Sequence, residues 1–83
     1  MTYKQFKEEV ENLGLEYSGP NEGEVFVTIG TVLCAAISTT EEQVGIWIYD
    51  DWFDRLSEQQ RVELFQLTAA LDETPLEDRG KVE

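Results

Sequence analysis

The sequence predicts a small two-layer α+β domain in which an N-terminal and a C-terminal helix cover one face of an antiparallel sheet. Three observations support this fold class. Apolar residues recur at helical spacing near both ends of the 83-residue chain. Between them the apolar pattern changes to the period of two that is typical of strands. Short turn signals separate the strand-like segments, which favours a meander of three or four strands in the order α-β-β-β-α.

The first helix is predicted from apolar residues at i, i+4 and i+7 spacing, which share one face. They are Phe6, Val10 and Leu13. Thr2 and Gln5 fit a capping box at the start of the helix. Gly14 is suited to end it, because glycine adopts positive φ at little cost.

The first strands follow directly. Residues 15–18 alternate over a short stretch, and residues 19–23 (GPNEG) are the strongest turn signal in the chain. Residues 24–29 then alternate, with three β-branched side chains on one face. They are Val25, Val27 and Ile29. The order Gly30-Thr31 favours a type II′ turn over a type I′ turn.

Two further segments have strand character. Residues 32–38 are apolar on both faces, which suits a central strand. After a polar loop, residues 44–49 predict another strand, and residues 50–56 predict a short helical turn capped by aspartate. The number of strands is three or four, depending on whether residues 15–18 pair.

The C-terminal helix is predicted to begin after Ser57, which forms a second capping box with Gln60. Its buried face has two candidates. One is the stripe of Leu64, Leu67 and Leu71, widened by Phe65 and Thr68 on one side and Ala70 on the other; the alternative is Val62, Phe65 and Ala69.

The helix is expected to stop at Thr74-Pro75, because proline cannot continue it. Thr74 as a cap, with Pro75 as the first helical residue, would open one more short turn. We expect Arg79 to fold back onto carbonyls at the helix end or onto a nearby acid. The predicted domain therefore spans residues 1–79, and residues 80–83 form a frayed tail.

The charge of the chain restricts its partners. Eighteen acidic side chains against six basic ones, with no histidine, give a formal net charge of −12. A nucleic-acid-binding surface needs Lys and Arg to neutralise phosphates, so direct nucleic-acid binding is excluded as the expected function. Anionic membranes are disfavoured for the same reason. The charge leaves two alternatives open, a basic protein partner or no charge-driven partner at all.

Residue types that carry catalysis are scarce. Without histidine the chain lacks the usual general base near neutral pH. Cys34 lies in an apolar run, and no Lys or Arg occurs within residues 8–54, so we expect a buried, unreactive thiol. Asp50, Asp51 and Asp54 are close together, but acids at a helix N-terminus explain them and no calcium-loop motif is present. The sequence thus predicts a non-enzymatic protein with no catalytic, cofactor or metal site.

Aromatic residues crowd the junction between the last predicted strand and the last helix. They are Trp47, Tyr49, Trp52 and Phe53. Core packing is the simplest interpretation. The functional alternative is an exposed patch that binds a protein partner or a second copy in a homodimer, since Trp and Tyr are common interface anchors. These four residues are our candidate partner-binding site.

The C-terminal part resembles a group of small prophage-encoded proteins of Gram-positive bacteria. The resemblance is carried by Leu56, residues 61–67 (RVELFQL) and residues 74–79 (TPLEDR), and extends over residues 3–79. The group ends in a helix followed by Thr-Pro-Leu/Ile-x-x-Arg. This chain departs from it at residues 70–72, where an aromatic is more usual, and lacks a basic tail after Arg79. The resemblance implies a mobile element and no particular reaction.

Two functional hypotheses follow. The first is a non-enzymatic phage accessory protein that acts through protein–protein contacts. The alternative is an acidic DNA mimic that inhibits a host nuclease or DNA-binding protein, which requires carboxylates spaced like phosphates on one face. The bacterial cytoplasm is the expected location, since the N-terminus predicts a charged helix rather than an apolar signal and a single cysteine forms no internal disulfide.

Overall fold

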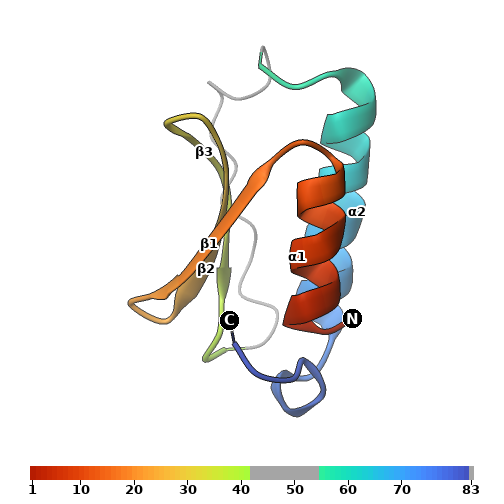
Figure 1. The fold of residues 1–83 in the computed structure, drawn as a ribbon. Helices are drawn as coiled ribbons and strands as arrows, with labels where there is room; N and C mark the ends of the chain where they lie inside the picture. Colours follow the sequence, from red (N-terminus) through yellow and green to blue (C-terminus); the bar gives the residue numbers. More distant parts are fainter. Residues whose placement is uncertain (42–54, 83) are drawn as a thin grey trace.

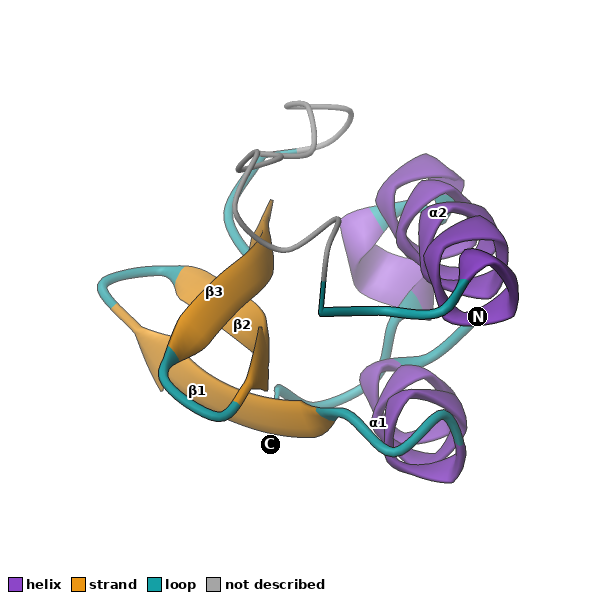
Figure 2. Cartoon of the chain, turned by 90° about the horizontal axis from the view of Figure 1, so that it is seen from above, coloured by secondary structure: helices purple, strands orange, loops and turns teal. Residues whose placement is uncertain are grey.

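A computed structural model of the protein describes residues 1–41 and 55–82. The elements are α1 (Tyr3–Asn12), β1 (Glu16–Asn21), β2 (Glu24–Ile29), β3 (Val32–Ser38), α2 (Glu58–Glu73) and the short 3-10 helix η2 (Leu76–Asp78). The predicted α+β fold is confirmed. The two helices run antiparallel, side by side, on one face of the sheet (Figures 1 and 2). The strand predicted at 44–49 and nearly all of the helical turn at 50–56 lie outside the described residues.

The sheet is antiparallel with strand order β1-β2-β3. Residues 16–18 of the predicted 15–18 segment are thus part of a strand, which Leu15 precedes, and β2 is central among the three described strands. The register aligns Tyr17, Val27 and Ala35 in one row across the sheet. A central position for β3 requires a second neighbouring strand, which was expected at residues 44–49. Because those residues lie outside the described ranges, the central position of β3 stays a prediction.

The first turn is shorter than predicted. Gly19 and Pro20 belong to β1, where the register shifts between Ser18 and Asn21. The reversal itself uses Glu22 and Gly23, with φ of 53° and 78°. Two consecutive positive φ values are what a type I′ hairpin needs. The cluster of turn-favouring residues therefore combines a bulge with a two-residue turn.

The other predicted chain reversals are confirmed. Gly30 has a φ of 59° while Thr31 is not in the positive region, as a type II′ turn requires. At the end of α1, Gly14 has a φ of 82°. Its N–H donates to Glu11 O (3.0 Å), and Leu15 N–H donates to Val10 O (3.2 Å). These two bonds form a Schellman motif, which satisfies carbonyls that the helix leaves unpaired.

The core lies between the sheet and the two helices. From α1 it receives Tyr3, Phe6 and Val10. Tyr3 was not in the predicted stripe, although it lies three positions before Phe6 and so shares its face. The Phe6 ring meets Tyr17 of β1 edge-on, with ring centroids 6.0 Å apart. This aromatic pair connects α1 to the sheet.

The structure decides which face of α2 is buried. Leu64 and Leu71 are buried and Leu67 is half-buried. Val62 is 49% exposed and Ala69 is exposed, so the alternative stripe is wrong. The buried face widens on one side only, through half-buried Phe65 and buried Thr68, while Ala70 on the other side is exposed. The Thr68 hydroxyl donates to Leu64 O (2.9 Å). That internal bond allows a polar side chain to be buried here.

Cys34 is buried, as predicted, and burial raises the pKa of its thiol. Since the thiolate is the reactive species, iodoacetamide is expected to alkylate the folded protein about 100-fold more slowly at pH 8 than the urea-unfolded chain. Mass spectrometry of timed samples measures both rates. Equal rates would show that the thiol is accessible in the native state.

Candidate functional site

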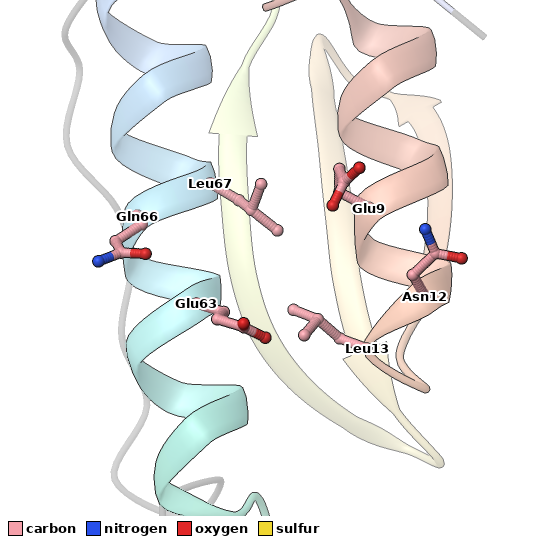
Figure 3. A pocket seen from close by; sticks show the side chains of 6 residues that line it. All are labelled: Glu9, Asn12, Leu13, Glu63, Gln66 and Leu67. Atoms are coloured by element: carbon pink, nitrogen blue, oxygen red, sulfur yellow. The ribbon is translucent and has the colours of Figure 1, made fainter.

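The predicted partner-binding residues Trp47, Tyr49, Trp52 and Phe53 lie outside the described residues, so that site stays a prediction. The described residues present a different candidate surface. It is an open groove of about 360 Å³ between α1 and α2. Its walls are Glu9, Asn12, Leu13, Glu63, Gln66 and Leu67, and we call it the interhelical groove (Figure 3).

Polar and apolar side chains face one another across this groove. Glu9 on α1 points toward Leu67 on α2, and Glu63 on α2 points toward Leu13 at the end of α1 (Figure 3). Each level of the groove thus has a carboxylate on one wall and a leucine on the other. A second hollow of about 410 Å³ shares Asn12, Leu13 and Glu63 and extends toward the start of α2.

Beside one end of the interhelical groove, Gln60 lines the second hollow. Its side-chain oxygen accepts from Ser57 N–H (2.8 Å) in the predicted capping box. Its amide nitrogen donates to Leu13 O (2.8 Å) at the end of α1. The same side chain therefore caps α2 and attaches it to α1, satisfying one of the helix-end carbonyls.

The other end of the helix pair is held by Arg79, which is 0% exposed. Its guanidinium donates to Thr74 O (2.7 Å), Asp72 O (3.0 Å) and Ser38 O (3.0 Å). It also donates to the Tyr3 hydroxyl (3.4 Å), and its backbone O accepts from Tyr3 N–H (2.8 Å). Arg79 therefore joins the C-terminal end of α2, the end of β3 and the start of α1. Of the two alternatives predicted for it, helix-end carbonyls are the partners observed.

Thr74 does not cap the following turn, contrary to prediction. Its hydroxyl donates back to Ala70 O (2.7 Å) and accepts from the N-terminal ammonium of Met1 (3.1 Å). The extra short turn does form as η2, which Pro75 precedes without a side-chain cap. The hydroxyl bonds to a carbonyl of the preceding helical turn instead of to the backbone of η2, as is common for threonine in helices.

Two features of these contacts were missed by sequence analysis. Gln60 was expected only as a capping residue, and its second bond to Leu13 joins residues 47 positions apart. The interhelical groove was also missed, because its walls come from two distant segments. Sequence analysis gave Glu9 and Glu63 no functional role; their polar positions beside apolar helix faces were the available signal.

Two chemical properties of the described residues complete the description. Within residues 1–41 and 55–82, no group of three or more Cys, Asp or Glu side chains is arranged to hold a metal ion. No helix in those ranges has the length and apolar character needed to cross a membrane.

Comparison with protein-family models, with curated proteins and with solved structures found no match for this chain. The resemblance to small prophage-encoded proteins therefore remains a hypothesis based on the residues quoted for it.

Proposed function

We propose that this protein is a small non-enzymatic accessory protein of a mobile element, acting in the bacterial cytoplasm by binding a basic surface of another protein. The observation that carries this proposal is the charge of −12 on an 83-residue chain. Many of the carboxylates are exposed on the folded surface, as at Glu11 and Glu58 near one end of the helix pair and Glu73, Glu77 and Asp78 near the other. The negative electrostatic field of these carboxylates attracts cationic partners and speeds their association.

The DNA-mimic alternative requires the carboxylates to gather on one face. The exposed acids named above lie near both ends of the helix pair: Glu11 and Glu58 at one end, Glu73 at the other, and Glu77 and Asp78 in the adjoining η2. Because this spread is compatible with one long acidic face as well as with several, competition with duplex DNA is the measurement that separates the two roles.

The proposal is tested by affinity capture from bacterial lysate at two salt concentrations, followed by titration of the purified captured protein. We expect one basic protein to bind saturably at both, more weakly at high salt because screening weakens exposed charge pairs. Duplex DNA is added as a competitor, and competition would favour the mimic. Capture of many basic proteins without saturation would overturn the proposal. Light scattering on the protein alone tests for the homodimer.

A further inference from the structure

We infer that the interhelical groove is the docking site for a basic peptide segment that presents two Lys or Arg side chains one helical turn apart. This inference rests on the proposed function and names the surface and the chemistry of its partner.

The first argument is the charge of the groove. Glu9 and Glu63 stand on opposite walls, and the residues three and four positions away from each on its own helix are uncharged. Glu8 and Glu11 differ, because Lys4 and Lys7 lie four positions before them. Neighbours at that spacing interact on a helix surface. No neighbour at that spacing thus neutralises the groove carboxylates, and they are open to cations supplied by a partner.

The second argument is the pairing of each carboxylate with a leucine. Leu13 and Leu67 are half-buried and face the groove opposite Glu63 and Glu9 (Figure 3). A Lys or Arg side chain has an apolar stem and a charged head, and it buries the stem while its head reaches polar surroundings. Each level of the groove offers a leucine for the stem and a glutamate for the head.

The third argument is spacing. Glu9 and Leu13 are four residues apart on α1, as are Glu63 and Leu67 on α2, so the two levels are about 6 Å apart, one helical turn. Two cationic side chains at i and i+4 of a partner helix have the same separation. The charge, the apolar contact and the spacing therefore all fit the same occupant, a helical segment with Lys or Arg at i and i+4.

The fourth argument is preorganisation. The amide of Gln60 fixes one end of the helix pair through Leu13 O, and Arg79 joins α2 to Tyr3 of α1 at the other. A groove whose walls are already held needs little ordering when a ligand binds, which favours affinity.

The test uses a defined probe, an acetylated 14-residue alanine-based helical peptide with Arg at i and i+4. An isomeric peptide with the two Arg on opposite helix faces is the control. Nitrogen-15 NMR titration is expected to show shifts concentrated at Leu13, Gln66 and Leu67 with the first peptide. The E9Q/E63Q variant is expected to bind it about fivefold to tenfold more weakly, as loss of two exposed ion pairs predicts. The matched variant E8Q/E11Q has the same net charge and is expected to change affinity less than about twofold.

Each other outcome overturns the inference. Equal weakening in both variants would mean that only overall charge matters. Equal binding of the two peptides would remove the spacing argument, and tight binding of Mg²⁺ alone by Glu9 and Glu63 would indicate a cation site instead. If a captured natural partner binds E9Q/E63Q normally, the inference fails while the proposed function stands. Thermal unfolding of both variants verifies that they fold.

Discussion

Replacing Arg79 with methionine is expected to lower the free energy of unfolding by about 3–5 kcal/mol. Methionine preserves an apolar stem in the buried site but removes every donor. Three half-buried backbone carbonyls that accept from the fully buried guanidinium then lose that partner. Urea unfolding followed by circular dichroism measures the change.

The size of this effect follows from the position of Arg79. Hydrogen bonds to a charged group stabilise by about 1.5–3 kcal/mol each, and their sum is reduced by the cost of burying the guanidinium. The bonds to Asp72 O and Thr74 O also place a positive charge at the negative end of the α2 dipole. Among the described residues the partners are carbonyls and a phenol rather than a carboxylate. The stabilisation that Arg79 gives the folded protein therefore depends on the geometry of its hydrogen bonds to these carbonyls.

Two variants make the expectation specific. Lys81→Met removes an exposed cation two residues away and is expected to change stability by less than about 0.5 kcal/mol. Arg79→Lys retains the charge but not the planar fork of donors, so an intermediate loss of about 2 kcal/mol is expected. A loss below about 1 kcal/mol for Arg79→Met would contradict the role assigned to the guanidinium. If Arg79→Met does not fold, the other two variants test the same role. A larger loss of stability for Arg79→Lys than for Lys81→Met supports it, and equal losses contradict it.

Features that depend on residues close in sequence were predicted well. Both capping boxes join residues three positions apart, and both form as expected. Gly14 ends α1 for the same reason, because a Schellman motif is completed within six residues. The strand β2 was predicted from its period of two, and β3 was predicted from a short run that is apolar on both faces.

Features that depend on distant residues could not be predicted. The bond from Arg79 to Ser38 spans 41 positions, and the one to Tyr3 spans 76. Sequence indicated that Arg79 would seek carbonyls or acids, but the choice depends on how α2 meets the sheet. The face of α2 was ambiguous because Phe65 fits both stripes. Packing settled it, since only the Leu64 side faces α1 and the sheet.

The second large effect is expected in β1, where Gly19→Ala should destabilise the protein by about 3 kcal/mol. Gly19 has a φ of +110°, a conformation that alanine rarely adopts. A Cβ at this position would also lie 2.9 Å from Glu24 O and 3.2 Å from Val25 Cα. Both atoms belong to the backbone of β2, so relief of the contact requires the paired strands to shift.

Gly30→Ala is the matched control, because Gly30 also has a positive φ, of +59°, in a hairpin of the same sheet. No heavy atom of the described residues lies within 4 Å of a Cβ built there. The backbone cost alone, about 1 kcal/mol, is expected for this variant. The difference of about 2 kcal/mol between the two variants isolates the contact with β2, and urea unfolding with equal m-values measures it. Equal losses would mean that β1 relaxes away from β2, and that the bulge at Gly19 adapts rather than fixing the position of the strand.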